Sequence, residues 1–359
     1  MERTAGHDAG IGIDELDLAA RNHAMPHEAL RSDITPIGLH YLLIHYDIPD
    51  VDPGSFRLRI DGHVGHSIAL TLEELRDRPS VTAVVTLECA GNGRALLEPR
   101  AISQPWLRGA VGTAMWTGTP LAPLLAEGEP LAGAVDVAFA GLDHGIEGDI
   151  EQDYERGLSL TEASGPDLLL AYEMNGQPLP PQHGFPLRLV VPGWYGMAHV
   201  KWLRAIDLVD VPFTGFQNTV AYRLRQDPGE EGEPVARMEP RALVAPPGFP
   251  DFMSRERIVR PGEVVIEGRA WSGRAPIARV EVSTDDGLTW ADAKLDSGAE
   301  HPWAWRRWRF AWNVQPGRHV LAARATDAGG HIQPDRQPWN RGGFANNLIH
   351  RVQVTCLAR

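Results

Sequence analysis

The chain has 359 residues, of which 43% are hydrophobic and 23% are charged, the proportions of an ordinary folded protein. They exclude a disordered, collagen-like or coiled-coil chain, and no apolar run approaches the roughly 18 residues that a membrane span needs. The formal net charge of −13 disfavours binding to nucleic acid or to an anionic membrane. Cys89 and Cys356 are too few for a disulfide framework. We therefore expect a two-domain enzyme without a membrane span.

The first 240 residues combine short strands and short helices without a regular strand–helix alternation. The Thr71–Arg76 segment begins with Thr-x-x-Glu, a capping box that predicts a helix start. A second short helix is expected at 121–125, and strands are expected at 55–60, 81–88 and 187–191. This pattern predicts an α+β domain and argues against a doubly wound nucleotide-binding fold.

Residues 226–250 mark a boundary, because they are rich in proline, glycine and charged residues, as connecting segments are. The charge changes there as well: residues 1–240 carry −18 and residues 241–359 carry +5. Beyond the boundary, stretches of alternating apolar and polar residues are separated by turn signals. Strands are expected at 264–268, 277–283, 303–312, 319–326 and 348–355, with a tight hairpin turn at 285–290. Their spacing predicts an all-β, immunoglobulin-like sandwich.

These patterns divide the chain into three parts. We expect an N-terminal extension at 1–34, an α+β catalytic domain at 35–235 and an immunoglobulin-like domain at 236–359. The first 20 residues contain no apolar segment behind a basic stretch, so a cytoplasmic protein is expected. A processed form of the chain would instead fit a periplasmic protein.

Cys89 stands at the end of a predicted strand and is followed by Ala-Gly-Asn-Gly-Arg. Gly91 and Gly93 allow a tight turn, and the cation of Arg94 together with free turn amides would favour a thiolate. Free cysteines are more often small buried hydrophobes, so that interpretation stays open, as does a Cys–His nucleophile. A zinc site is not expected, because no second cysteine or histidine pair has ligand spacing. The residues alone therefore indicate either a reactive thiol or a core position.

Several longer motifs accompany this stretch. They lie at 89–94, 106–118, 170–180, 183–188, 191–193 and 199–202, and in the last third at 270–273, 286–290 and 303–306. With Cys-Ala-Gly-Asn-Gly-Arg and His-Gly-Phe-Pro-Leu-Arg among them, the chain resembles the sulfite oxidase family of molybdenum enzymes over residues 35–355. The resemblance implies a molybdopterin-binding α+β fold followed by a dimerisation domain, and hence a homodimer.

The resemblance also implies a cofactor and a set of site residues. Cys89 would bind molybdenum, which carries one molybdopterin and oxo groups, and a soft thiolate suits such a centre. The implied contacts to the cofactor are His45, Cys89, Asp143, His183, Arg188, His199, Val200 and Lys201. The residues expected to act on a small oxyanion substrate are Arg94, Trp106, Tyr222 and Arg341.

Two positions depart from the family pattern. Leu43 stands where the family has a substrate-binding arginine, and an ungapped match places Gly342 at a second one, with Arg341 one position early. Each charge-assisted bond lost to a dianion would cost about 1.5–3 kcal/mol. Arg341, Arg306 and Arg108 are the candidates to replace the missing charge.

The implied reaction is oxo transfer on a small oxyanion, with sulfite oxidised to sulfate and the electrons passed to an external acceptor. The chain has no Cys-x-x-Cys-His haem motif and no added haem or flavin domain, so a separate electron-transfer protein such as a cytochrome is expected. The acidic first domain would suit a basic partner, although a solvated acidic surface is the commoner explanation. Three alternatives stay open: reduction of nitrate or of an S- or N-oxide, a family member without sulfite activity, and a non-enzymatic sandwich protein in which Cys89 is merely buried.

Overall fold

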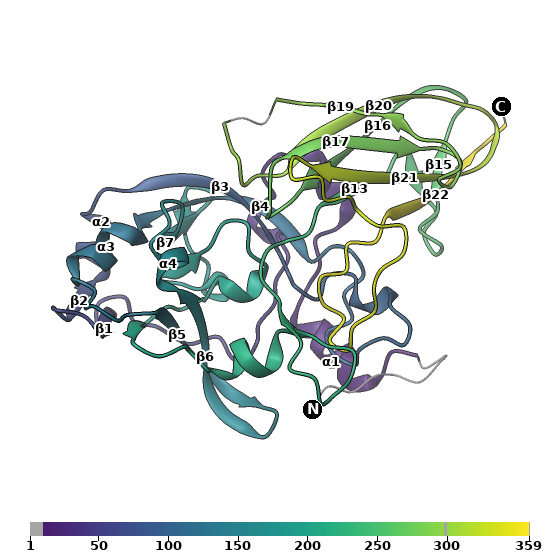
Figure 1. The fold of residues 1–359 in the computed structure, drawn as a ribbon. Helices are drawn as coiled ribbons and strands as arrows, with labels where there is room; N and C mark the ends of the chain where they lie inside the picture. Colours follow the sequence, from purple (N-terminus) through teal and green to yellow (C-terminus); the bar gives the residue numbers. More distant parts are fainter. Residues whose placement is uncertain (1–9, 298–299, 359) are drawn as a thin grey trace.

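The computed structural model describes residues 10–297 and 300–358, which form a sheet-rich N-terminal part and a C-terminal β-sandwich (Figure 1). Helices are few and short, as the sequence predicts for a mixed fold. The α-helices are α1 (Ile13–Arg21), α2 (Leu72–Arg76), α3 (Leu121–Glu127) and α4 (Leu160–Ala163). The single turns of other helix types are η1 (His27–Arg31), η2 (Ile37–Leu39), η3 (Arg94–Leu96), η4 (Pro181–His183), η5 (Gly196–Ala198) and the π-helical η6 (Gln217–Ala221).

The predicted start of α2 is confirmed by its capping hydrogen bonds. The Thr71 hydroxyl accepts the Glu74 N–H at 3.0 Å, and the Glu74 carboxylate accepts the Thr71 N–H at 2.8 Å. This reciprocal pair satisfies two backbone donors that the helix itself leaves unpaired. The local sequence therefore fixes where this helix begins.

Two sheets build the N-terminal part. The first has the order β2 (Ile68–Thr71), β1 (Arg57–Gly62), β10 (Ala205–Val209), β5 (Asp136–Glu147) and β6 (Ile150–Ser159). The second has the order β3 (Val81–Glu88), β4 (Val111–Pro120), β7 (Leu169–Met174) and β8 (Gln177–Pro178), and β9 (Arg188–Val190) also pairs with β7. Among the described strands of these two sheets, only β1 and β10 pair in parallel, which does not fit a doubly wound sheet.

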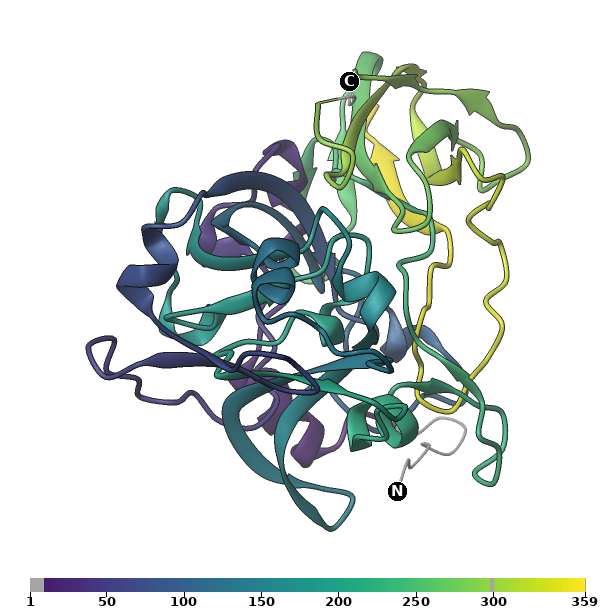
Figure 2. The same cartoon turned by 60° about the vertical axis from the view of Figure 1, so that its left-hand side comes forward.

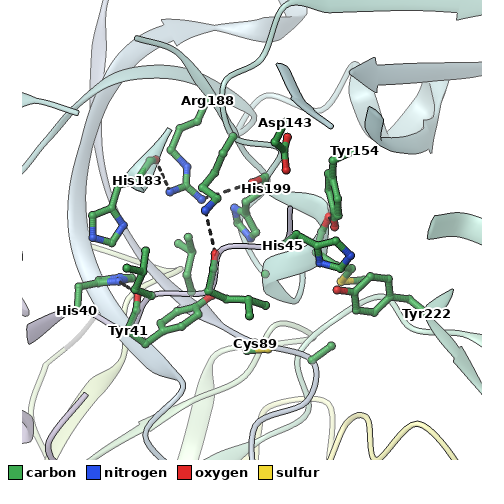
Figure 3. Close-up of a pocket in the computed structure, with 17 residues that line it drawn as sticks. His40, Tyr41, His45, Cys89, Asp143, Tyr154, His183, Arg188, His199 and Tyr222 are labelled. Atoms are coloured by element: carbon green, nitrogen blue, oxygen red, sulfur yellow. Dashed lines mark hydrogen bonds between the residues drawn. The ribbon is translucent and has the colours of Figure 1, made fainter. Parts of the chain in front are cut away.

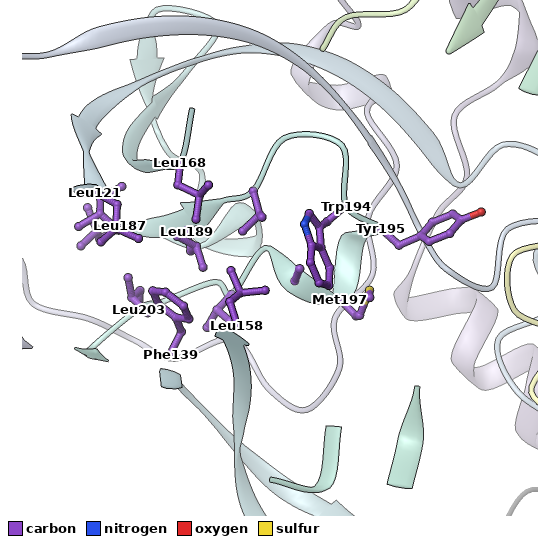
Figure 4. Packing of buried hydrophobic residues seen from close by; sticks show 14 of the residues in the cluster. Leu121, Phe139, Leu158, Leu168, Leu187, Leu189, Trp194, Tyr195, Met197 and Leu203 are labelled. Carbon is purple, nitrogen blue, oxygen red and sulfur yellow. The ribbon is translucent and has the colours of Figure 1, made fainter. Parts of the chain in front are cut away.

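The main hydrophobic core joins residues of both sheets (Figure 4). Phe139 of β5 and Leu189 of β9 are fully buried in it, together with Leu187 and Leu203 beside β9 and β10. The turn η5 packs against the same core through Met197. This packing fixes the loops at the ends of β9 and β10, and those loops carry several of the candidate site residues.

The sandwich consists of two further sheets around a second core. One has the order β13 (Arg241–Val244), β16 (Gly262–Trp271), β20 (Arg306–Val314) and β19 (Lys294–Leu295). The other has the order β14 (Phe249–Pro250), β15 (Arg257–Val259), β22 (His350–Cys356), β21 (Gly317–Asp327), β17 (Ile277–Ser283) and β18 (Ala291–Asp292). A small pair, β11 (Arg223–Leu224) and β12 (Glu233–Pro234), lies in the segment that precedes the sandwich.

Four of the five predicted C-terminal strands match observed strands, and the expected strand at 303–312 is wrong at its start. β20 begins only at Arg306, because Trp303 and Trp305 lie in the preceding turn and contact the N-terminal part instead. The Trp305 N–H donates to Thr86 Oγ1 at 2.7 Å, and its indole N–H donates to the Asp33 carbonyl at 2.8 Å. The alternation of tryptophans thus belongs to an inter-domain contact rather than to a sheet.

The segment between β21 and β22, residues 328–349, leaves the sandwich and runs along the N-terminal part before it returns (Figure 2). It brings Gly342 beside Arg94, whose Nε donates to the Gly342 carbonyl at 2.8 Å. We call residues 328–349 the return segment. Within the described ranges, no helix is both long enough and apolar enough to cross a membrane.

Candidate active site

Cys89 begins the loop that follows β3, and hydrogen bonds hold this loop in place. The Cys89 N–H donates to the Ala110 carbonyl at 2.9 Å, and the Asn92 side chain accepts the Ala110 N–H at 3.0 Å. Gly93 has a φ of 93°, a conformation that suits glycine, and a side chain at Gly91 would come within 2.7 Å of the Arg94 guanidinium. The Gly-Asn-Gly turn therefore fixes the position of the thiol.

The sandwich holds the same loop from behind through the carboxylate of Glu88. Glu88 forms an ion pair with Arg241, and it accepts the Trp271 indole N–H at 2.8 Å and the Asn92 side-chain amide at 2.9 Å. Arg241 also donates to the carbonyl of Asn346 in the return segment. Glu88 and Arg241 are 2% and 1% exposed, so this pair is a buried link between the two parts of the chain.

A pocket of about 670 Å³ lies over Cys89, and side chains from both N-terminal sheets and their loops converge on it (Figure 3). Eight of the residues expected from the sequence line this pocket: His45, Cys89, Asp143, His183, Arg188, His199, Lys201 and Tyr222. Sequence reasoning missed other lining residues, among them His40, Tyr41 and Tyr154. His40 and Tyr41 could have been predicted from the sequence, because this polar His-Tyr pair stands close to His45.

Buried polar atoms in the pocket lack partners, which indicates a ligand with many donors and acceptors. Asp143 Oδ1, Arg188 Nε and His40 Nε2 are buried without a hydrogen-bond partner among the described residues. Arg188 donates instead to the His183 carbonyl at 2.9 Å, and Lys201 Nζ donates to the Leu43 carbonyl at 2.8 Å. Leaving buried polar groups unpaired is unfavourable, so the pocket suits a polar group such as the molybdopterin that the sequence resemblance implies.

Burial shifts the pKa values of several titratable side chains in the pocket. Burial raises the pKa of Asp143 to about 6 and lowers the pKa of Lys201 to about 7, with Arg188 adding to the second effect. Burial likewise lowers the pKa of His183 to about 2, so its ring is neutral near pH 7. The pocket therefore offers neutral donors and acceptors beside cations that a bound anionic group would stabilise.

His199 lines the pocket and is held in place by backbone contacts, whereas Val200 lies behind the pocket wall. His199 Nδ1 accepts the Val191 N–H at 3.1 Å, and its other ring nitrogen lies 3.1 Å from the Trp194 carbonyl, to which it donates. Val200 is fully buried in the main core and does not line the pocket. The cofactor contacts implied for these two residues stay a prediction; both ring nitrogens of His199 already have backbone partners, and the Val200 side chain is enclosed in the core.

The thiol of Cys89 is 7% exposed, and its surroundings act in opposite directions on its ionisation. Burial raises the pKa of Cys89, whereas the charge of Arg94, the Gly91 N–H and the Trp106 indole N–H oppose that effect. Among the described residues, no cluster of three or more His, Cys, Asp or Glu side chains could hold a metal ion. A metal at Cys89 would therefore take its remaining ligands from a cofactor.

Arg94 and Tyr222 meet on the side of Cys89 that the return segment covers. The Arg94 guanidinium lies 5.0 Å from the Phe344 ring centre, and the Tyr222 ring lies 5.2 Å from the same ring. Arg94 and Trp106 do not line the pocket itself, although both act on the Cys89 thiol. Burial raises the pKa of Tyr222, which keeps its hydroxyl protonated and able to donate.

None of the three arginines expected to replace the missing charge, Arg341, Arg306 and Arg108, lines the pocket over Cys89. A side chain at Gly342 would come within 2.3 Å of the Phe344 ring, so this backbone is packed for glycine. Arg341 is half-buried next to it, with its N–H donating to the Arg225 carbonyl at 2.9 Å, and it does not line the pocket. The suggestion that Arg306 supplies charge there is wrong, because its guanidinium donates to the Ile277 and Asp296 carbonyls inside the sandwich.

Arg108 was the other candidate replacement, and it too lies elsewhere. It lines a separate cleft between the N-terminal part and the sandwich, not the pocket over Cys89. It stands two positions after Trp106 along the chain, but Arg108 is half-buried and lines the cleft, whereas Trp106 is buried and lines neither that cleft nor the pocket. Sequence proximity therefore misled the assignment.

An acidic residue that the sequence did not single out holds His45 from outside the pocket lining. The Glu147 carboxylate lies 2.8 Å from His45 Nε2 and accepts the Gln217 side-chain amide at 2.9 Å and the Tyr46 hydroxyl at 3.2 Å. Burial raises the pKa of Glu147, but these hydrogen bonds outweigh it and the net pKa is lowered. Glu147 is thus an anion that fixes the ring of His45 at the pocket edge.

Comparison with known proteins agrees with this arrangement. The oxidoreductase molybdopterin-binding domain family matches residues 45–217, and the Mo-co oxidoreductase dimerisation domain family matches residues 235–356. Human mitochondrial sulfite oxidase is 37% identical over 93% of this chain, which spans 64% of the human protein. Sulfite oxidase of Arabidopsis thaliana is 33% identical over 92% of this chain and 91% of its own length.

Two further similarities extend this picture. The NAD(P)H nitrate reductase of Hordeum vulgare is 32% identical over 89% of this chain and 39% of its own length. The crystal structure of the sulfane dehydrogenase SoxCD from Paracoccus pantotrophus superposes with a TM-score of 0.81 at 26% identity, over 97% of this chain and 91% of that chain. The fold and the pocket over Cys89 define a molybdopterin-binding oxidoreductase. The chain belongs to the sulfite oxidase family, and the resemblance and the molybdenum–molybdopterin cofactor expected from the sequence are confirmed.

Proposed function

We propose that this protein oxidises sulfite to sulfate, with water supplying the added oxygen and an external acceptor taking the two electrons. The observation that carries the proposal is the position of Cys89 at a polar pocket beside Arg94 and Tyr222. Similarity to sulfite oxidases over about nine-tenths of the chain supports the same substrate. When bound through the thiolate of Cys89, molybdenum–molybdopterin supplies oxo transfer and accepts an electron pair.

The pocket residues would hold this cofactor by polar contacts. Arg188 and Lys201 are cations that would meet its phosphate and carbonyl oxygens, and Asp143 would accept from its ring N–H groups. His45, held by Glu147, and His183 would complete the set. His199 and Val200 would act through the backbone they position.

The substrate side combines one buried cation with a protonated phenol. Arg94 would attract and orient the oxyanion, and Tyr222 would donate a hydrogen bond to one of its oxygens. Trp106 would form the adjacent wall, and Arg341 would add positive potential from the return segment. Arg156 fixes Tyr222 from behind, because its guanidinium lies 6.0 Å from that ring and donates to the Gln217 and Val235 carbonyls.

The reaction requires an electron acceptor, for which we propose a basic electron-transfer protein such as a cytochrome. The hairpin of β5 and β6 carries Glu147 beside the pocket and exposes Ile146, Asp149, Ile150 and Glu151 at its tip. Exposed apolar residues inside an acidic rim suit a basic partner that passes close to the site. We further propose that the sandwich has the immunoglobulin-like topology and forms a homodimer, with domain boundaries near residues 35 and 236. The cytoplasmic location expected from the sequence stays a prediction.

A second candidate function is reduction of nitrate or of an S- or N-oxide by the same cofactor. It is favoured by Leu43, which lines the pocket in place of an arginine, and by the similarity to nitrate reductase. A neutral residue at this position suits a less highly charged substrate than a dianion. Nitrate is a monoanion and the oxides are neutral, so their turnover would be less sensitive to the missing charge.

The deciding experiment is sulfite-dependent reduction of ferricyanide by protein whose molybdenum content has been quantified. Saturable turnover per molybdenum supports sulfite oxidation. Protein that is loaded with molybdenum but inert toward sulfite would contradict the proposal. The same preparation is then assayed with reduced viologen against nitrate, an S-oxide and an N-oxide, and turnover there would establish the second candidate instead.

A further inference from the structure

A second cavity lies between the N-terminal part and the sandwich, and it shares no residue with the pocket over Cys89. The space in this open cleft is about 1520 Å³, part of which is continuous with the solvent. Its lining comes from residues 26–28, from the loop that holds Arg108, from the hairpin of β14 and β15, and from β21 and β22. The proposed oxidation of sulfite uses none of these residues.

The side chains that line this cleft are strongly cationic. Arg108, Arg255, Arg257, Arg318 and Arg351 line it, against the two glutamates Glu28 and Glu256. Like charges gathered around one space repel each other, and an anion between them removes that repulsion.

The carboxylates nearby neutralise only some of these arginines. Glu28 lies 3.6 Å from Arg255 and 3.3 Å from Arg257, and Arg351 is paired with Asp286 and Asp335 outside the cleft. In the part of the chain that the structure describes, Arg108 and Arg318 have no carboxylate partner. Arg108 is half-buried, so its charge is less well solvated than that of an exposed arginine.

A buried histidine adds an unused hydrogen-bond donor to the same space. His350 is 4% exposed, and its Nδ1 accepts the Val244 N–H at 3.1 Å. A neutral ring that accepts at Nδ1 carries its proton on Nε2, and no oxygen or nitrogen of the described residues accepts that proton. The ring of His27 packs edge to face on it at 5.1 Å. Both rings are neutral near pH 7, because burial and the charge of Arg108 lower the pKa of each, that of His27 to about 4.

We propose that this cleft binds a tetrahedral dianionic oxyanion of the sulfate and phosphate class, held by Arg108, Arg318 and the Nε2–H of His350. All three groups are donors that cannot accept, so their ligand must offer acceptors only. A tetrahedral dianion presents acceptor oxygens in several directions, which suits donors that come from three separate elements. The inference does not depend on the proposed oxidation of sulfite.

The test is calorimetric titration of the holoenzyme with sodium sulfate and, separately, with sodium phosphate, at constant ionic strength in chloride. Sulfate and phosphate also fit the site beside Cys89, so the titrations use the Arg94→Gln background, in which that site is weakened. Adding Arg108→Gln should weaken binding at the remaining site at least about tenfold, because one charge-assisted bond is lost. Arg59→Gln removes an exposed arginine of β1, outside the cleft, and should leave the affinity unchanged.

A second variant, His350→Asn, tests the donor. The asparagine oxygen can still accept the Val244 N–H, whereas the donor at Nε2 is lost, so anion binding should weaken while the unfolding midpoint stays close to that of the parent. Ring-proton signals of His27 and His350 in NMR spectra should shift on addition of phosphate and not on addition of perchlorate at equal ionic strength. Whichever of sulfate and phosphate binds more tightly identifies the source of the ligand.

Three results would overturn the proposal. The first is unchanged affinity in the Arg108→Gln and His350→Asn proteins. The second is an equal response to perchlorate, which would mean that the anion only screens charge. The third is a change in the dimer dissociation constant of Arg108→Gln by sedimentation without any anion binding to the parent, which would mean that a second copy of the chain fills the cleft. Because these titrations contain no sulfite, they test anion binding in the cleft even if the enzyme does not oxidise sulfite.

Discussion

The pocket over Cys89 and the sandwich directly behind it differ in whether their buried polar groups have hydrogen-bond partners. In the pocket, Asp143 and Arg188 keep buried atoms without partners among the described residues. Behind Cys89, both oxygens of the buried Glu88 are occupied, by Arg241 and Asn92 on one side and by the Trp271 indole on the other. The pocket is thus incomplete without its cofactor, whereas the support behind it is complete in the protein alone.

This difference assigns the two regions distinct roles in one site. The side chains of the pocket would recognise the cofactor and the proposed substrate, whereas the sandwich fixes the loop that carries the thiol. Since Arg241, Trp271 and the return segment all contact that loop, the C-terminal part contributes to the geometry of the site in addition to its proposed role in a dimer. Changes in the two regions should therefore separate loss of cofactor from loss of stability.

The largest expected effect is that of Cys89→Ser. Serine is a poor ligand for a soft metal centre, so turnover should be lost and molybdenum should be bound weakly or not at all, while the fold is retained. Metal analysis and circular dichroism check this outcome. Cys356→Ser is the matched control, because Cys356 is equally buried but lies in the sandwich core. Full molybdenum content and activity in Cys89→Ser protein would refute the assignment of the ligand.

The next effect is that of Arg241→Met, which leaves Glu88 buried without its cation. Breaking one partner of a buried pair costs about 3–5 kcal/mol, so the free energy of unfolding in urea should fall by that order. The double variant Glu88→Gln with Arg241→Met should recover part of the loss, because no uncompensated charge remains. Arg309→Gln breaks an exposed pair with Asp296 and should cost no more than about 1 kcal/mol. Equal losses in both single variants would contradict the buried link.

How far the sequence predicts the molecule depends on whether a feature is local. The start of α2 at Thr71 and the strand at 277–283 follow from local signals and were found. Most of the residues expected to contact the cofactor line one pocket, and motifs that lie in order along the chain predicted them. Arg306 and Arg108 were misplaced, because which cavity an arginine enters depends on packing between distant segments. The pairing of Glu147 with His45 spans 102 positions and has no local signature.

The stability of the protein should depend on pH in the acid range, because buried neutral histidines occur around the pocket and in the cleft. Burial lowers the pKa of His40, His183 and His199 around the pocket and of His27 and His350 in the cleft. Each takes up a proton near pH 6.5 when unfolded but only at lower pH when folded. The unfolded state thus binds more protons below pH 6.5, and stability falls as the pH falls through this window.

The contribution of one histidine can be measured with His27→Gln. For His27, whose folded pKa is about 4, the loss between pH 7 and pH 5 amounts to about 2 kcal/mol. The variant should therefore lose about that much less stability than the parent over this range in urea unfolding. His66→Gln, at an exposed ring in the N-terminal part, should follow the parent. The same pH dependence in both variants and in the parent would show that His27 titrates normally when folded.

The smallest effect expected is that of restoring charge at position 43. Leu43 is half-buried in the pocket lining, and its carbonyl accepts from Lys201, so its side chain can be changed without breaking that bond. With sulfite as substrate, Leu43→Arg should lower the KM by up to about tenfold, because one charge-assisted contact is added, and should change kcat less. Leu43→Met keeps the size without the charge and should leave the KM unchanged. If Leu43→Arg also leaves the KM unchanged, the substrate does not approach this wall of the pocket. The positive charge that attracts the substrate must then come from Arg94 and the return segment alone. If arginine raises the KM for nitrate or an oxide while sulfite is unaffected, the neutral residue serves the second candidate function.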